Sequence, residues 1–376
     1  MRYLLIIILF CTSIFCSCNK SADKNNVATV SSDSLSLKYA QGFAIDYYAD
    51  YKKVTVKNPW ANNAVIRSYY LVNDSSTRTP ADGVKIIIPV TKMAVTVVTI
   101  FEFLSLLDEI DCVNAVCQPQ LIYNQDIRAK YKSSGLVDLG DSFSIDIETI
   151  LHTKPNAILV SGYGSADIYT NRLEKTGIPV IINNEWMEST PLARSEWIKF
   201  IAAFFDKENL ADSIFDLVAN NYNSIKYGAK EIENKTTVMI GNDFRGTWYM
   251  PGGRNYMAAL IADAGGNYFY ENNTETGSLP LNYEKVIKNF SQSDVWLNCN
   301  FNSFDELLKV DKKNSYFRPF KLRQVYNFNK RKMPEGANDF WESAVARPDL
   351  LLNDIIAVLY PDNFPDYETV YIEKLK

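Results

Sequence analysis

The sequence predicts an α/β protein of two Rossmann-like lobes, each with a central, mainly parallel sheet, joined by a single long α-helix. Apolar, strand-like runs alternate with helical patterns in two separate regions of the chain, which is typical of parallel sheets covered by helices. One long amphipathic pattern separates these regions. Two similar helix-then-strand segments, beginning at Asp146 and at Asn282, further indicate that the two regions fold alike.

The N-terminus has the features of an export signal. The apolar run over 3–10 is too short to span a bilayer as a helix. The segment before Cys18 resembles the cleavage box of bacterial lipoproteins, so we expect 1–17 to be removed and Cys18 to carry the lipid. A plain secretory signal cut nearby is the alternative. Residues 18–35 are polar and predict a flexible, lipidated tether.

Residues 36–205 are predicted to form the first lobe. Three β-like runs indicate an added antiparallel element at its start, over 43–48, 53–57 and 65–72. From residue 85 onward, the predicted strands are 86–88, 93–98, 112–117, 157–160 and 179–182. The predicted helices are 100–107, the one that begins at Asp146, and 166–175.

Residues 206–231 are predicted to form the linking helix, because apolar residues recur with helical spacing from Leu210 to Ile225. Such a helix is roughly 35 Å long at about 1.5 Å per residue, and acts as a stiff strut. Residues 232–376 then repeat the alternation as the second lobe. Its predicted strands are 237–240, 295–297 and 324–328, and its predicted helices are 256–264, the one that begins at Asn282, and 348–359.

Composition excludes several classes of function. The net charge of −5 and the lack of a long basic run argue against a nucleic-acid partner. A single histidine, His152, and scattered cysteines argue against a dedicated metal site and against Ser-His-Asp or Cys-His hydrolases. No GxxxxGK[ST] phosphate loop is present. We therefore expect no enzyme and no permanently bound cofactor.

Two short segments carry a family resemblance. In Asp146-Ile-Glu148 and Asn282-Tyr-Glu284, an N-capping residue is followed by a glutamate in the first helical turn. Residues 84–362, which include these two segments, resemble the solute-binding proteins of ABC importers for cobalamin, ferric siderophores and haem. Other stretches are similar to a Bacteroidetes-type lipoprotein branch: 184–188, 248–253, 264–266, 336–342 and 347–349. One departure is Val97-Val98-Thr99, where the family has a Ser/Thr-rich loop.

The resemblance implies a two-lobed monomer, held at the membrane by its lipid anchor in the periplasm, that binds its ligand between the lobes. It also implies that Glu148 and Glu284 dock onto arginines of an ABC permease and ATPase complex. Aromatic and arginine side chains in loops at strand ends suit a bulky metal chelate. On this basis, the predicted ligand-binding residues are Thr99, Tyr123, Ser142, Tyr163, Trp186, Arg245, Trp248, Tyr249, Arg254 and Trp341. Tyr256 is expected in the core.

The expected ligand is a ferric siderophore, because Arg245 and Arg254 favour an anionic chelate. Cobalamin is the first alternative, favoured by the aromatic residues, and haem is the second, with His152 badly placed to ligate its iron. Two other classes remain open. One is a cofactor-handling enzyme such as a chelatase, and the other is a glycan-binding lipoprotein that uses the aromatic rings as stacking platforms.

Overall fold

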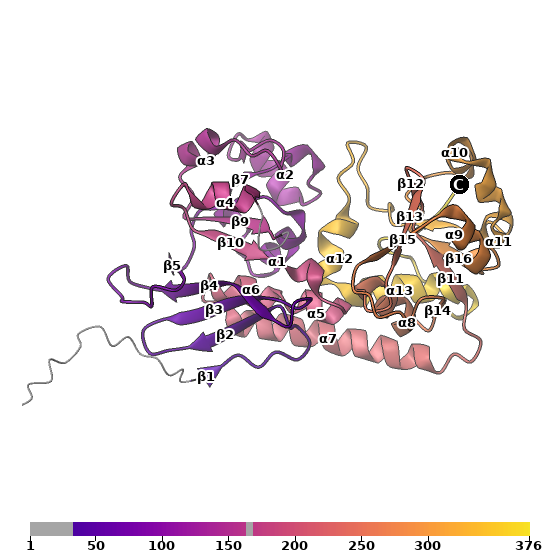
Figure 1. Cartoon of the computed structure of the whole chain (residues 1–376), viewed down its shortest axis with the longest axis horizontal. Helices are drawn as coiled ribbons and strands as arrows, with labels where there is room; N and C mark the ends of the chain where they lie inside the picture. The colour runs from indigo at the N-terminus through magenta and orange to yellow at the C-terminus, as the bar shows by residue number, and fades with distance from the viewer. Residues whose placement is uncertain (1–32, 163–167) are drawn as a thin grey trace, which may run out of the picture.

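The computed structural model describes residues 33–162 and 168–376, and places two lobes along one long helix (Figure 1). The predicted signal over 1–17, the lipidated Cys18 and nearly all of the tether lie outside the described residues. The predicted ligand residue Tyr163 also lies outside them. The alternation of strands and helices is present in both lobes, so the predicted α/β fold class is confirmed.

The first lobe is built on a five-stranded parallel sheet in the order β10-β9-β6-β7-β8. Its strands are almost entirely apolar because helices cover the sheet. The strands are β6 (Met93–Val95), β7 (Val113–Val116), β8 (Val137–Asp138), β9 (Ala157–Ser161) and β10 (Val180–Asn183). The helices are α1 (Phe101–Leu106), α2 (Gln125–Lys132), α3 (Ile147–Thr153) and α4 (Ile168–Glu174).

A second five-stranded sheet, in the order β1-β2-β3-β4-β5, forms the added N-terminal element. Its strands are β1 (Asp33–Ser34), β2 (Phe43–Tyr47), β3 (Lys52–Asn58), β4 (Ala64–Val72) and β5 (Val84–Ile87). The first four pair in antiparallel fashion. Three of them, β2, β3 and β4, correspond to the predicted runs, and β1 was not predicted. The strand predicted at 86–88 does not join the sheet of the lobe. It pairs with β4 in parallel, since the intervening loop over 73–83 returns the chain to Tyr69 in the middle of β4.

The chain just before β2 is held by two buried carboxylates. Glu196 accepts hydrogen bonds from the backbone N–H groups of residues 38–40, at 2.8–2.9 Å. Glu188 accepts from the N–H groups of Gln41 and Gly42. A Cβ atom on Gly42 would lie 2.8 Å from the indole of Trp197, so only glycine fits at that position. The added sheet is therefore fixed to the first lobe through backbone contacts.

Three helices follow the first lobe: α5 (Pro191–Ser195), α6 (Ile198–Ala203) and α7 (Glu208–Lys230). The 23 residues of α7 correspond to about 35 Å, and the helix runs beneath both lobes in Figure 1. Its buried face includes Phe215 and Tyr222. Tyr222 donates a hydrogen bond to Asp263 in the second lobe, at 2.8 Å. The predicted long connecting helix is thus present and packs along its whole length.

The parallel sheet of the second lobe contains three strands. These are β14 (Asn267–Tyr268), β11 (Thr237–Ile240) and β16 (Val295–Leu297), and β14 takes the place of the strand predicted at 324–328. The strand predicted at 324–328 is only β17 (Tyr326–Asn327), which pairs with β18 (Glu373–Lys374) near the C-terminus. An antiparallel sheet that sequence reasoning missed contains β12 (Asp243–Phe244), β13 (Thr247–Pro251) and β15 (Ser278–Leu281).

The helices of the second lobe are α8 (Tyr256–Asp263), α9 (Tyr283–Phe290), α10 (Phe304–Val310), α11 (Arg318–Lys321), α12 (Ser343–Ala346) and α13 (Pro348–Leu359). The two segments that carry the family resemblance begin α3 and α9. Asp146 accepts from the N–H of Glu148, and Asn282 accepts from the N–H of Lys285, both at 3.0 Å. Both residues therefore act as N-caps, as the sequence predicts.

The attachment of the added sheet can be tested at Glu196. Its side chain is fully buried, and Glu196→Gln replaces one accepting oxygen by a donor that faces backbone N–H groups. We expect the free energy of unfolding to fall by about 2–4 kcal/mol, measured by urea denaturation. Hydrogen exchange at residues 38–40 is expected to accelerate. The matched change Glu233→Gln, at an exposed site, should alter neither quantity; equal stability of the two variants would contradict the role of Glu196.

Candidate ligand-binding site

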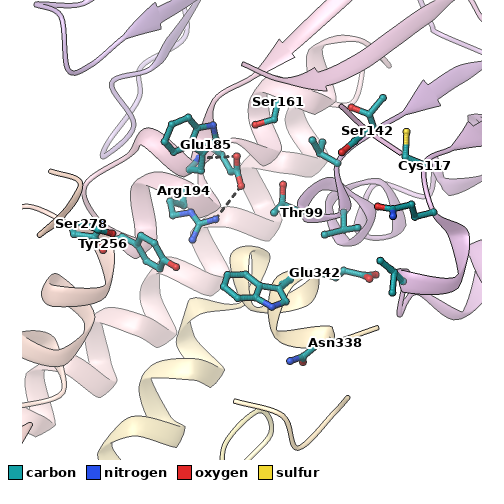
Figure 2. Close-up of a pocket in the computed structure, with 18 of the residues that line it drawn as sticks. Thr99, Cys117, Ser142, Ser161, Glu185, Arg194, Tyr256, Ser278, Asn338 and Glu342 are labelled. Atoms are coloured by element: carbon teal, nitrogen blue, oxygen red, sulfur yellow. Dashed lines mark hydrogen bonds and ion pairs between the residues drawn. The ribbon is translucent and has the colours of Figure 1, made fainter. Parts of the chain in front are cut away.

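A cavity of about 710 Å3 lies between the two lobes (Figure 2). This volume is within the range of about 300–1,000 Å3 that is usual for small-molecule sites. The wall from the first lobe consists of loops that follow parallel strands: residues 96–99 follow β6, Cys117 and Gln118 follow β7, and Ser161 ends β9. Ligands of open α/β sheets bind at this carboxyl edge.

Four of the predicted ligand residues line the cavity. Thr99 and Ser142 belong to the first lobe, Trp186 lies in the 3-10 turn Glu185–Met187 that follows β10, and Trp341 comes from the second lobe. The side chain of Trp341 is 51% exposed, so its ring is open to a ligand. Their contact with a ligand remains a prediction.

Two neighbouring predictions in β13 have different outcomes. Trp248 is 1% exposed and donates its indole N–H to the carbonyl of Ile240, at 2.8 Å, so it is a core residue and its prediction as a ligand residue is corrected. Tyr249 is 51% exposed and lies in a second hollow beside the cavity. The two outcomes differ because successive side chains of a strand point to opposite faces of the sheet.

Three further predicted residues lie outside the cavity. Arg245 is in the turn between β12 and β13, with its guanidinium 5.1 Å from the ring centre of Phe244. Arg254 is exposed in the turn before α8. Tyr123 reaches the site only through its backbone, whose N–H donates to Glu342. A sequence gives the loop in which an arginine lies but not the direction of that loop.

The basic residue in the cavity wall that sequence reasoning missed is Arg194 of α5. It donates to Glu185 at 3.0 Å, and its guanidinium lies 4.2 Å from the ring centre of Tyr256 (Figure 2). Glu185 also accepts from the backbone N–H of Trp186, at 2.7 Å. The Nε of Arg194 is buried and has no hydrogen-bond partner among the described residues. The charge of Arg194 is thus already neutralised by Glu185 within the wall.

Tyr256 was expected in the core and instead lines the cavity as the first residue of α8. The only signal for Arg194 in the sequence is a lone arginine directly after the apolar stretch over 191–193, which also suits a surface residue. Both positions depend on how α5 and α8 meet.

Glu342 joins the two lobes at the cavity. It precedes α12 in the second lobe and accepts hydrogen bonds from the backbone N–H groups of Tyr123 and Asn124 in the first lobe. It is 3% exposed. Burial raises the pKa of Glu342 to about 7, the two N–H donors oppose this shift, and the charges of Asp339 and Glu102 add to it.

The added sheet also reaches the cavity, through Trp60 in the β3–β4 turn. The Trp60 indole donates to the carbonyl of Met187, at 2.9 Å, and meets the ring of Trp186 edge-to-face with centroids 5.0 Å apart. Sequence reasoning gave this segment no role in binding. An exposed tryptophan in a hairpin turn was the available signal.

The residue types present offer few ligands for a metal ion. Among residues 33–162 and 168–376, no group of three or more His, Cys, Asp or Glu side chains is placed to hold a metal ion. The cysteines Cys112, Cys117 and Cys299 are buried, and burial raises the pKa of each thiol to about 12.

Known families and structures resemble this architecture. A family model for periplasmic binding proteins matches residues 119–305. The match places this part of the chain in the periplasmic binding protein family. Members of this family bind solutes, which agrees with the prediction of a non-enzymatic protein. The similarity to a Bacteroidetes-type branch remains a prediction.

Two lipoproteins of Methanocaldococcus jannaschii are similar in sequence. One is 26% identical over 253 residues, which span 67% of this chain and 59% of the relative. The other is 23% identical over 357 residues, spanning 90% and 87%. The family match and these relatives confirm the predicted location as a periplasmic lipoprotein. No helix in the described part of the chain is long and apolar enough to cross a membrane.

Solved structures share the fold at low sequence identity. A periplasmic haem-binding protein from Roseiflexus has a TM-score of 0.54 and 18% identity, and the match covers 72% of this chain and 98% of that one. Helicobacter pylori CeuE, determined as a complex with nickel and histidine, has a TM-score of 0.59 and 14% identity, covering 84% and 91%. At these identities the likeness establishes the fold.

The raised pKa of Glu342 predicts a specific pH dependence. A carboxyl whose pKa is higher in the folded than in the unfolded protein stabilises the fold most at low pH, and this contribution is lost as the pH rises toward 7. Between pH 5 and pH 7, the unfolding free energy of the unaltered protein should therefore fall more steeply with pH than that of Glu342→Gln. The two slopes should differ by up to about 1.4 kcal/mol per pH unit. Denaturant titrations across this range measure the difference.

Other carboxyls also titrate in this range, so the comparison needs a control. Glu335→Gln changes an exposed glutamate in the same segment and should keep the pH profile of the unaltered protein. Parallel profiles for the unaltered protein and Glu342→Gln would show that Glu342 titrates normally.

Proposed function

We propose that this protein captures a bulky metal chelate between its lobes and delivers it to an ABC permease. The observation that carries the proposal is the cavity itself, which has aromatic walls from three parts of the chain: Trp60, Trp186 and the Tyr256–Trp341 side. Its described residues include no cluster of metal-ligating groups. A ligand that already coordinates its metal needs flat apolar contact and few polar groups. The haem-binding and nickel-binding proteins of similar fold support this class of ligand.

The charge of the cavity favours a chelate of low net charge. Arg194 is neutralised by Glu185, and Glu342 is the other ionisable carboxyl of the wall. Arg245 and Arg254, the reason for expecting an anionic siderophore, lie elsewhere. A ferric siderophore therefore remains the first candidate only in its neutral forms, such as a ferric trihydroxamate. Cobalamin meets the same requirement and is the second candidate.

Haem suits the cavity less well. Its two propionates need cationic partners, and the single arginine of the wall already has a carboxylate partner. His152 is exposed on α3, outside the cavity. Tyr256, the one tyrosine among the described residues of the wall, has its ring face covered by Arg194.

Glu148 and Glu284 are proposed to dock the protein onto the permease. Each is exposed in the first turn of a capped helix, α3 in one lobe and α9 in the other (Figure 1). Neither forms a salt bridge with another described residue. Two carboxylates on separate lobes, linked by the rigid α7, present a fixed charge pattern, and such patterns set register and association rate.

The ligand is tested by thermal-shift measurements and native mass spectrometry with cyanocobalamin, a ferric trihydroxamate, a ferric tricatecholate and haem. We expect cyanocobalamin or the trihydroxamate to stabilise the fold by about 2.7 kcal/mol at 100 times its Kd. Trp341→Ala should weaken that ligand at least tenfold without unfolding the protein, because the side chain is half exposed. Selective binding of the tricatecholate would reject the low-charge argument, and binding of a polysaccharide alone would reject the chelate class.

Docking is tested by charge reversal. Glu148→Arg combined with Glu284→Arg should leave the Kd for the chelate unchanged and abolish its uptake in cells. The control, Asp50→Arg combined with Glu233→Arg, reverses two other exposed carboxylates and should leave uptake intact. Normal uptake in the Glu148 and Glu284 double variant would exclude the docking role.

A further inference from the structure

A second hollow of about 370 Å3 opens beside the cavity on the side of the second lobe. We call it the annex. It shares three lining residues with the cavity, one of which is Trp341, so the two spaces adjoin. Its polar lining is dominated by one residue type, asparagine, at Asn242, Asn298, Asn300, Asn329 and Asn338.

The asparagines converge because of sheet topology. β11 and β16 are parallel neighbours, and Trp296 continues the pairing to Val325, just before β17. Asn242, Asn298 and Asn329 follow the carboxyl ends of β11, β16 and β17 respectively. The annex therefore occupies the edge of the second sheet at which α/β folds receive ligands.

Two of the amides have no partner among the residues that the structure describes. Asn329 and Asn338 are fixed to each other, with 3.1 Å between Oδ1 of the former and Nδ2 of the latter. In contrast, the side chains of Asn298 and Asn300 make no hydrogen bond to any described residue. Both have left-handed backbone, with φ of 50° and 54°. Each open amide offers two donors and one acceptor to a ligand.

The charge and shape of the annex restrict what fits. Lys332 is the one charged residue among its described lining residues, and no carboxylate is present. The rings of Phe244 and Tyr249, 59% and 51% exposed, provide flat apolar surface beside the amides. Groups that both donate and accept hydrogen bonds and carry no charge complement such a lining, and hydroxyl and carboxamide groups are of this kind.

We propose that the annex is a subsite for a neutral arm of the ligand, rich in hydroxyl or carboxamide groups, while the metal centre occupies the cavity. This inference rests on the proposed capture of a chelate, and it adds which substituent the protein selects. Removal of the open amides is then expected to weaken arm-bearing chelates and leave arm-free chelates unaffected.

The test uses Asn298→Gly combined with Asn300→Gly, because glycine keeps the left-handed backbone and removes only the amides. The matched control is Ser134→Gly combined with Lys154→Gly, two exposed left-handed positions of the first lobe. The probes are methyl β-D-glucoside for hydroxyl groups and propionamide for carboxamides. Their binding to the full mature chain is measured by saturation-transfer NMR. We expect at least one probe to bind, about tenfold more weakly to the annex variant and equally to the control.

The same experiment with acetate separates neutral from anionic recognition. Acetate binding that disappears in Lys332→Met, without any response to the neutral probes, would overturn the proposal. Equal binding of the neutral probes to the annex variant and the unaltered protein would overturn it as well. Binding of cyanocobalamin and of a ferric trihydroxamate is measured in separate titrations. If neither chelate binds, the proposed function is rejected. The probe data still decide the chemistry of the annex in that case.

Discussion

The fold depends on buried carboxylates that collect backbone N–H groups from distant segments. Glu196 and Glu188 hold residues 38–42 in front of the added sheet, Glu342 holds residues 123–124, and Asp354 accepts from residues 370–372 at the C-terminus. A buried carboxylate is costly unless its oxygens are hydrogen-bonded, and a loop is costly to bury unless its N–H groups find acceptors. Each contact satisfies both requirements at once, so the two partners are stable only together.

The candidate site also depends on these buried carboxylates. The added sheet carries Trp60 into the cavity wall only because the chain before β2 is fixed to the first lobe by Glu188 and Glu196. Glu342 both lines the cavity and ties the two lobes across it. The rigid α7 limits the relative positions of the lobes from the other side. The same residues therefore set the binding geometry and the stability of the fold. The protonation of Glu342 should affect both.

The cavity and the annex divide the recognition of a ligand between two chemistries. Aromatic rings and one neutralised arginine offer contact area with little net charge. Such a surface suits the body of a chelate whose metal is already fully coordinated. Asparagine amides offer hydrogen bonds without charge, which suits polar substituents. A protein built in this way selects by shape and by neutral hydrogen bonding more than by electrostatic attraction, so its affinity should depend only weakly on salt.

The sequence by itself determined the two α/β lobes, the helix that joins them, and the capped starts of α3 and α9. These features depend on periodicity and on contacts within a few residues, and both are visible along a chain. Only the tertiary structure decided which residues face the cavity. Trp248 and Tyr249 are adjacent yet lie in the core and at the annex, and Arg194 and Tyr256 meet although they belong to different helices. Contacts between residues far apart in the chain depend on how loops turn and lobes dock, and no local pattern encodes that geometry.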